Sequence, residues 1–283
     1  MADNTPVRSN SLSLYNFMCQ HIVGTEEPVR MKRLMTMVRD NLRSNERSVF
    51  ITSGSVGEGL DLKGSDIDLM VVSKLCDVHE NIETVKFNPA KINFVMEMDN
   101  TKPGYTLLRF VGTLLCGGCS LVCEYYDNSW YLSSDLFKTY FLNEVKSPDQ
   151  LNTIHGPCFS DMNGEWDFAL CFQNPNWIEA AESWVDRGNK SWPSSDVKSD
   201  IIEHGVLLVP IGCKGSDTEA LEWRISFSVA EKLLIYSFSH TQLLCYALMK
   251  ILLKDVINCN NNCKDLLCSY FIKTIIFWVS EET

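Results

Sequence analysis

Two aspartates one residue apart, Asp66 and Asp68, lie at the start of an apolar segment that is typical of a β-strand. Side chains at positions i and i+2 of a strand share a face, so both carboxylates should point the same way. Two such carboxylates repel each other unless a cation lies between them, and Mg²⁺ that carries nucleotide phosphates is the ion their oxygens suit. The alternative is a pair of surface aspartates that flank a turn.

A Gly-Ser turn, Gly54-Ser55, follows the preceding apolar segment and could offer backbone N–H groups and a hydroxyl to those phosphates. Together with the aspartate pair, it predicts the active site of a nucleotidyltransferase. A P-loop is excluded, because Gly59 has the right spacing from Gly54 but Leu60 stands where a lysine is required. The dinucleotide-binding fingerprint is also absent, since Leu62 occupies its third glycine position.

A third carboxylate is usually needed in two-metal phosphoryl transfer, where it bridges the metals and accepts the proton of the attacking hydroxyl. Asp167 is the best candidate, because a carboxylate in an apolar strand is costly to bury unless it is paired or metal-bound. One face of its segment carries Trp166, Phe168, Leu170 and Phe172, and the other carries Asp167, Ala169 and Cys171. The alternative is an edge strand whose Asp167 faces water.

The composition is that of a globular protein, with 283 residues, 45% apolar and 22% charged. This length suffices for one large domain or for two lobes that share a cleft. The net charge of −11 makes the protein a poor general binder of nucleic acid, so any such contact would need a local basic patch. The polar N-terminus has no secretory h-region, so we expect a cytoplasmic protein with reduced cysteines. The uncharged run 233–249 is too polar to span a membrane.

Residues 26–43 are predicted to form an amphipathic helix. Its apolar positions follow helical spacing and comprise Met31, Leu34, Met35, Val38 and Leu42. Its other side carries the clearest basic stripe of the chain, which comprises Arg30, Lys32, Arg33, Arg39 and Arg43. This stripe is either a solvated helix face or a contact for a nucleic-acid backbone on the outside of the protein.

The remaining pattern predicts a mixed α/β region followed by helices. Strands are expected at 49–51, 67–72, 106–110, 120–125 and 206–210, the last of these being the final strand. A short helix is expected at 178–186 and a surface loop at 189–199. Further helices are expected at 228–237, 241–258 and 264–281. We therefore expect an N-terminal helical segment (1–45), a catalytic core (46–215) and a helical lobe (216–283).

The chain resembles the cyclic GMP-AMP synthase (cGAS)-like nucleotidyltransferases and their Mab-twenty-one-like relatives. The resemblance runs from about residue 48 to the C-terminus and includes the Gly-Ser turn and the three aspartates. Its other motifs are Asn174-Pro175-Asn176-Trp177, Leu207-Leu208-Val209-Pro210, Trp223-Arg224-Ile225-Ser226-Phe227-Ser228, Glu231-Lys232, Leu248-Met249-Lys250 and Ser269-Tyr270-Phe271-Ile272-Lys273-Thr274. The tryptophan-arginine block and the last motif are strongly specific when they occur with the acids.

The resemblance implies a bilobal α/β (α+β) nucleotidyltransferase fold, in which a mixed catalytic sheet faces a C-terminal helical lobe and an N-terminal spine helix precedes both. It also implies an enzyme that uses Mg²⁺ (or Mn²⁺) to join nucleoside triphosphates, commonly ATP and GTP, into a cyclic dinucleotide after sensing a ligand. The metal-binding acids would be Asp66, Asp68 and Asp167, with Asp167 activating the attacking hydroxyl. Gly54 and Ser55 would hold the donor triphosphate. The helical lobe would line the nucleotide pocket with Arg224, Ser226, Ser228, Glu231, Lys250, Ser269, Tyr270 and Lys273.

Several of these residues have other interpretations. Ser228 and Glu231 have the spacing of a capping box, worth about 1 kcal/mol of helix stability. Lys250 could face solvent, and Arg224 could form a structural ion pair. Tyr270 and Lys273 can share a helix face, where an aromatic ring for a base beside an ammonium for a phosphate would be a sensible pair.

Two departures from the family qualify the resemblance. Vertebrate DNA-sensing members carry a His-Cys-Cys-Cys zinc insertion, but the corresponding segment 237–245 offers only His240 and Cys245. We therefore expect a nucleic-acid activator, if there is one, to be double-stranded RNA in preference to DNA. Family members also continue with more helices, so we expect the chain to be incomplete at its C-terminus. The leading hypothesis is a cytoplasmic innate-immune receptor enzyme, and the rival is a non-catalytic Mab-twenty-one-like nucleotide-binding or interaction scaffold.

Overall fold

The computed structural model describes residues 5–85, 88, 90–112, 119–145, 153–161, 163–187, 192–261, 263–264 and 266–282. Its strands are β1 (Ser48–Ser53), β2 (Ile67–Ser73), β3 (Cys76–His79), β4 (Ile92–Glu97), β5 (Tyr105–Val111), β6 (Cys123–Tyr126), β7 (Ser129–Leu132), β8 (Thr153–His155), β9 (Cys158–Ser160), β10 (Trp166–Asn174), β11 (Val206–Val209) and β12 (Glu222–Ser226). Its α-helices are α1 (Thr5–Phe17), α2 (Glu26–Arg43), α3 (Gly54–Gly57), α4 (Cys119–Val122), α5 (Ser134–Val145), α6 (Glu182–Val185), α7 (Ser195–His204), α8 (Ser228–Tyr236), α9 (His240–Leu252) and α10 (Ser269–Glu282).

The strands form one mixed sheet in the order β1-β2-β10-β11-β12-β5-β4-β3. The pairs β2–β10 and β3–β4 are parallel, and the other pairs along this path are antiparallel. The hairpins β6–β7 and β8–β9 branch from β5 and β10. The largest apolar core joins Val78 on β3 to Phe172 on β10, although these strands are far apart in the sheet order. The sheet therefore curls around this core, and α5 inserts Phe137 into it.

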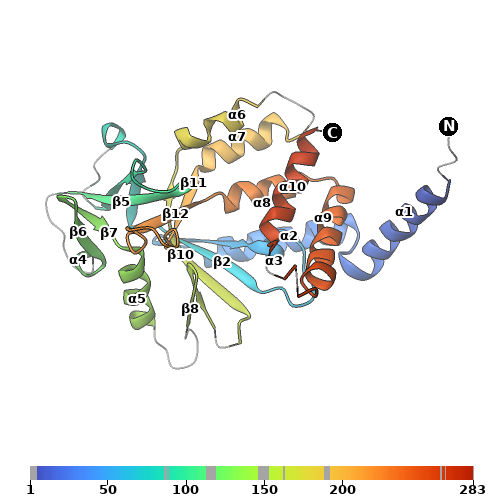
Figure 1. Ribbon diagram of the computed structural model, residues 1–283. Coiled ribbons are helices and arrows are strands. Elements are labelled where there is room, and N and C mark those ends of the chain that lie inside the picture. Colours follow the sequence, from blue (N-terminus) through green and yellow to red (C-terminus); the bar gives the residue numbers. More distant parts are fainter. Residues whose placement is uncertain are drawn as a thin grey trace.

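The helices α8, α9 and α10 form a lobe beside the sheet, and α1 projects from the end of this lobe (Figure 1). A second apolar core holds the lobe together and includes Ile235 of α8, Tyr246 of α9 and Ile276 of α10. Leu60, which follows the Gly-Ser turn, is fully buried in this core. The predicted α/β fold, with a mixed sheet facing a helical lobe, is confirmed.

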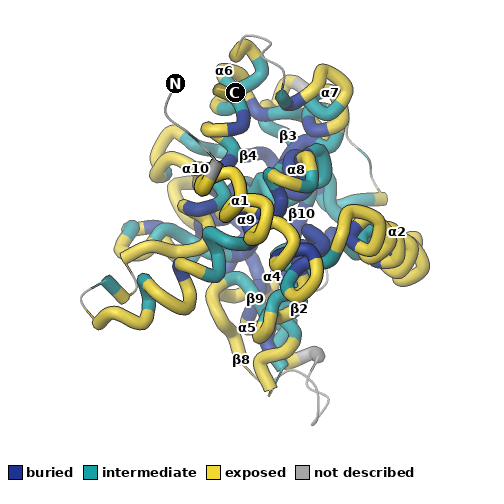
Figure 2. The backbone as a smooth tube through the Cα atoms, turned by 90° about the vertical axis from the view of Figure 1, so that its right-hand side faces the viewer, coloured by how far each residue is buried: buried dark blue, intermediate teal, exposed yellow. Residues whose placement is uncertain are grey.

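Helix α2 begins and ends where the sequence predicts, but it presents the opposite side to the protein. Its buried residues are Val29, Thr36 and Asp40. The stripe with apolar spacing faces solvent instead, and comprises Met31, Leu34, Met35, Val38 and Leu42, with exposed fractions from 49% to 82%. Figure 2 shows α2 as a largely exposed helix at the edge of the molecule.

The polar inner side of α2 has a physical reason. The carboxylate of Asp40 accepts hydrogen bonds from the backbone N–H and the hydroxyl of Thr52 on β1, at 2.8 and 2.6 Å. The Arg33 guanidinium donates to the carbonyls of Glu58, Ile235 and Tyr236. These groups would otherwise be buried without partners, which costs more free energy than leaving apolar side chains exposed. Because α2 bonds to both the sheet and α8, the expected N-terminal spine helix is confirmed.

Four predictions about secondary structure were wrong. Residues 120–125 are split between α4 and β6, and β12 follows the strand that was predicted to be last. The helix predicted from residue 264 begins at Ser269, because backbone hydrogen bonds fold the described residues just before it into turns. Part of the predicted loop, residues 189–191, lies outside the described residues.

Residues 192–194 of the predicted loop are irregular, but the remainder is not, since α7 begins at Ser195. The Ser194 hydroxyl caps this helix by accepting a hydrogen bond from the N–H of Val197, and Gly205 ends it with a φ of 70°. A serine after Pro193 followed by a glycine at the far end is a signal that the sequence offered. No helix in the described part of the chain is both long and apolar enough to cross a membrane.

Candidate active site

The three predicted aspartates meet where two neighbouring parallel strands, β2 and β10, begin. Asp66 immediately precedes β2, Asp68 lies on β2, and Asp167 lies directly beside Asp68 on the parallel strand β10. One carboxylate oxygen from each lies within 4.8 Å of the others. Among the described residues, these aspartates form the one cluster of His, Cys, Asp and Glu side chains that could hold a metal ion. The predicted common face of Asp66 and Asp68 is confirmed, and Asp167 does not face away as an isolated edge residue.

The negative charges of the three carboxylates repel one another. Burial raises the pKa of Asp68 to about 6, and the charges of Asp66, Asp167 and Glu58 add to this rise. One oxygen of Asp167 accepts a hydrogen bond from the Ser160 hydroxyl, which orients the carboxylate. Clustered carboxylate oxygens that repel one another fit a hard divalent cation such as Mg²⁺, which would relieve the repulsion.

The Gly-Ser turn fits closely over the acids. Gly54 has a φ of 61°, and a Cβ atom there would lie 1.8 Å from a carboxylate oxygen of Asp68. No other residue can occupy this position without displacing Asp68. Ser55 follows on the single turn of α3, and its hydroxyl accepts a hydrogen bond from the ammonium group of Lys250 on α9. The structure thus joins the predicted phosphate turn to a predicted lysine of the helical lobe.

The predicted residues line three adjacent hollows. A groove of about 1410 Å³ contains Ser55, Asp66, Lys250 and Ser269. A smaller cavity of about 190 Å³ is lined by other predicted residues, namely Gly54, Asp68, Asp167, Arg224, Ser226, Ser228, Glu231 and Lys273. Tyr270 lies in neither of these, but in an aromatic hollow of about 360 Å³. Glu231 is the other predicted residue that lines this hollow.

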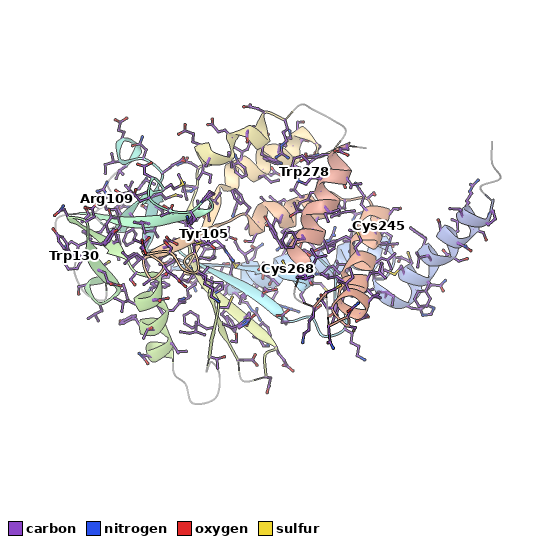
Figure 3. The ribbon with its side chains drawn as sticks, in the orientation of Figure 1. Tyr105, Arg109, Trp130, Cys245, Cys268 and Trp278 are labelled. Carbon is purple, nitrogen blue, oxygen red and sulfur yellow. The ribbon has the colours of Figure 1, made fainter. Side chains whose placement is uncertain are left out.

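Tyr270 begins α10 beside Ser269 and is 57% exposed, so its ring is accessible to a ligand. The aromatic hollow extends along α10 to Trp278, where Arg187 lies 4.2 Å over the indole ring. Figure 3 shows Trp278 near one end of α10 and Cys268 just before the other, far from Arg109 and Trp130 at the opposite end of the sheet. Tyr270 follows Ser269, which lines the large groove, and its exposure shows that it is not part of an apolar core.

Ser228 and Glu231 do not form the capping box that their spacing allows. Helix α8 is preceded by Phe227, which makes no side-chain cap, and the Glu231 carboxylate instead accepts a hydrogen bond from Lys273 at 2.8 Å. The Ser228 hydroxyl is buried inside the small cavity and has no hydrogen-bond partner among the described residues. A free hydroxyl in this position is available to a ligand.

Arg224 and Ser226 were expected in the helical lobe, but they lie on β12 and therefore belong to the sheet. Arg224 is exposed at the rim of the small cavity and forms no salt bridge within the described chain, so the alternative of a structural ion pair is not what the structure shows. The Ser226 hydroxyl accepts a weak hydrogen bond from the N–H of Ser228 at 3.4 Å. Lys250 does not face solvent either, because it reaches Ser55.

The basic stripe of α2 is divided. Arg30, Lys32, Arg39 and Arg43 are exposed, and Arg43 lies 5.6 Å over the ring of Trp166. Arg33 is turned inward to the three carbonyl groups described above, so its assignment to an exposed ligand-binding face was wrong.

Sequence reasoning missed residues that support the site. Glu58 is 2% exposed and lies next to the small cavity, with Lys273 and Tyr246 on its carboxylate. An acid between two glycines, three residues after the Gly-Ser turn, was the available signal. Lys232 on α8 donates to the carbonyl of Thr52 at 2.9 Å. Ser160 lies on a three-residue strand that gave no signal.

Residues 157–237 match the family model of the Mab-21 protein nucleotidyltransferase domain. This segment contains β10 with Asp167, β12 with Arg224 and most of the small cavity. The match confirms the resemblance to the cGAS-like and Mab-21 family and agrees with the mixed α/β fold.

Proposed function

We propose that this protein is a Mg²⁺-dependent nucleotidyltransferase that joins ATP and GTP into a cyclic dinucleotide. The observation that carries the proposal is the cluster of Asp66, Asp68 and Asp167 under a glycine turn that leaves no room for a side chain. A protein that needed only the fold would have no use for three carboxylates held against their mutual repulsion. The family match supports the transferase class.

The three aspartates would hold the cation, which when bound would neutralise phosphate charge and lower the pKa of an attacking hydroxyl. Asp167 is the proposed proton acceptor, because Ser160 orients one of its oxygens and leaves the other for the reacting group. Asp66 and Asp68 lie at the start of β2, beside the turn that would carry the donor triphosphate. Their charge would keep phosphate oxygens out of the site until the cation is present.

Ser55 and Lys250 are the proposed contacts for the donor triphosphate. They are already hydrogen bonded to each other across the two lobes, and both line the large groove that opens beside Asp66. A phosphate would take over the lysine as its partner, since an ammonium binds an anionic oxygen more strongly than a neutral hydroxyl.

The bases are proposed to contact side chains of α10 and of β12. Tyr270 offers an exposed ring on which a base could stack, and Arg224 offers a guanidinium at the cavity rim. The remaining polar contacts proposed for the nucleotides are Gly54, Ser226, Ser228, Glu231 and Ser269. Serine hydroxyls suit either a ribose or a base edge, because they donate and accept.

An activating ligand is proposed for the outer side of α2. Arg30, Lys32, Arg39 and Arg43 are exposed basic residues of this helix on a protein whose net charge is −11. Double-stranded RNA is the proposed activator, in a cytoplasmic innate-immune response. Phosphate neutralisation would supply the affinity, and no base contact is required.

The second candidate function is a non-catalytic scaffold that keeps the fold to bind a nucleotide or a partner. The complete set of acids and the intact Gly-Ser turn favour the enzyme. The exposed apolar stripe on α2 is the one observation that favours the scaffold, because patches of this kind occur at interaction surfaces.

The experiment is incubation of the purified protein with ATP and GTP labelled at the α-phosphate, with Mg²⁺ or Mn²⁺ and with or without double-stranded RNA. We expect a phosphatase-resistant product that contains both labels and that is absent from Asp167→Asn. A folded protein that binds nucleotide but forms no product under any of these conditions would support the scaffold instead.

A further inference from the structure

Lys273 on α10 is held between two carboxylates from different parts of the chain. Its ammonium nitrogen lies 2.7 Å from the carboxylate of Glu58 and 2.8 Å from that of Glu231 on α8. The side chains of Lys273 and Glu58 are only 15% and 3% exposed. Burial alone would lower the pKa of Lys273, but the two carboxylates outweigh burial and raise it. Its charge is therefore fully engaged inside the protein.

Glu58 immediately follows α3, the helical turn that begins with Gly54 and Ser55, and it is held from three helices. Its carboxylate also accepts a hydrogen bond from the Tyr246 hydroxyl of α9 at 3.2 Å. Its backbone carbonyl accepts one from Arg33 of α2 at 2.9 Å. The carbonyl of Gly57, one residue earlier, accepts a hydrogen bond from the Tyr236 hydroxyl at 2.8 Å. The end of the turn that begins at Gly54 thus has a fixed position.

Lys250 makes a useful contrast with Lys273. It forms no ion pair within the described part of the chain, and its hydrogen-bond partner is the neutral hydroxyl of Ser55. Burial lowers the pKa of Lys250, and the positive charge of Lys273 adds to this effect, although nearby acids partly offset both. A buried ammonium without a counter-ion gains most when an anion arrives, whereas one with two counter-ions would first have to give them up.

We infer that Lys273 is a positioning residue and not a phosphate ligand. It fastens Glu58 to α8 and α10, so that the turn of Gly54 and Ser55 stays over the aspartates, and Lys250 is the lysine that receives the triphosphate. This inference rests on the proposed function for its consequence, but the clamp itself is a property of the protein without nucleotide.

The test is a double-mutant cycle with Lys273→Met, Glu58→Gln and the double variant, together with Lys250→Met as the matched control. Melting temperature and the affinity for a non-hydrolysable ATP analogue with Mg²⁺ are measured for each. Lys273→Met leaves the buried carboxylate of Glu58 and the half-buried carboxylate of Glu231 without their counter-ion, so its melting temperature should fall by about 10 °C. Adding Glu58→Gln removes one of those charges and should recover much of the loss in both measurements.

Lys250→Met should behave in the opposite way, with a melting temperature at or above that of the wild type and an affinity lowered at least about tenfold. In turnover assays, Lys250→Met should raise the KM for the donor nucleotide, and Lys273→Met should chiefly lower kcat. If Lys273→Met is too unstable to purify, recovery of folded protein in the double variant supports the clamp, and failure to recover it contradicts the clamp.

The inference would be overturned if Lys273→Met kept its melting temperature and showed a drop in nucleotide affinity that Glu58→Gln did not restore. Failure of the proposed function is a separate result, because wild-type protein would then bind no nucleotide at all. The melting temperatures of the cycle would still decide whether Lys273 and Glu58 are coupled.

Discussion

Periodicity in the sequence predicted the orientation of the side chains correctly at the start of β2 and β10, where the three acids lie, and incorrectly on helix α2. On β2 and β10, alternation predicted which side chains share a face, and Asp68 and Asp167 lie side by side as expected. On α2, helical spacing predicted the bounds of the helix, but its apolar stripe faces solvent. The comparison teaches that periodicity fixes the relative orientation of side chains within one element, and that it does not fix which side of the element meets the protein.

The cause of the difference is what each element has to cover. The faces of β10 pack against apolar side chains, with Phe172 in one core and Ala169 and Cys171 in another. Helix α2 instead packs against backbone groups that need a hydrogen-bond partner, namely the N–H of Thr52 and the carbonyls of Glu58 and the end of α8. Only polar side chains such as Arg33 and Asp40 can supply those partners. Hydrogen bonding to these groups decided the side of α2 that is buried.

The largest expected effect tests the acids at the start of β2 and β10. Asp68→Asn should abolish turnover, because it removes a metal ligand and should cost several kcal/mol of transition-state stabilisation, on the order of 10³-fold or more in rate. The fold should survive, since the substitution also removes a repulsive charge beside Asp66. Product formation and melting temperature are the two measurements. Near-normal turnover by the folded variant would end the assignment of these acids to a metal.

The next effect tests α2 by comparing its two sides. Arg33→Met should lower the free energy of unfolding by about 2–4 kcal/mol, because three carbonyl groups are left without a charged donor. Its neighbour Leu34 is 53% exposed, and Leu34→Ala should change that free energy by less than about 0.5 kcal/mol. Urea titrations of both variants provide the measurement. Equal effects, or a larger effect at Leu34, would restore the orientation that the periodicity predicted.

A smaller effect concerns the pH dependence of metal binding at the acids. The pKa of Asp68 is raised to about 6 from its ordinary 3.8, so the folded metal-free protein holds this proton more tightly than the unfolded chain does. Stability without metal should therefore fall as pH rises from about 4 to about 6. A divalent ion must displace the same proton, so Mn²⁺ affinity should weaken about tenfold for each pH unit below 6.

Isothermal titration with Mn²⁺ between about pH 5 and pH 8 would measure this dependence, with Asp68→Asn as the control that should lack the step. A flat profile in the wild type would mean that Asp68 is ionised throughout this range. The three acids would then be less strongly coupled than their separation indicates.

The smallest effect tests the exposed basic residues of α2. Lys32→Glu with Arg39→Glu should weaken binding of double-stranded RNA and lower the slope of log affinity against log salt by about 0.7–0.9 for each phosphate that the protein no longer neutralises. A matched double variant, Lys214→Glu with Lys264→Glu, changes the net charge equally at exposed positions outside α2. Identical slopes in the two double variants would show that α2 is not the binding site.

Local periodicity and motif chemistry accounted for much of the site in advance. The Gly-Ser turn and the three acids were recognisable from residue types and spacing, whereas Lys250 and Lys273 were implied only by the resemblance to the family. The helix α7 was missed although Ser194 and Gly205 mark its ends, which is an error of interpretation and not a lack of signal. Ser160 and the structural role of Lys232 were missed for a different reason, because their partners lie on other segments that no local pattern connects to them.

The sequence by itself determined that Asp66 and Asp68 share a face, that Gly54 and Ser55 form the turn beside them, and that 26–43 is a helix. These properties follow from backbone geometry within one segment. Only the tertiary structure decided that Lys273 is held by Glu58 and Glu231, that Lys250 reaches Ser55, and that Arg33 faces inward. Each of these depends on which buried polar group is left without a partner when separate elements pack, and that is set by the assembled fold rather than by any one stretch of the chain.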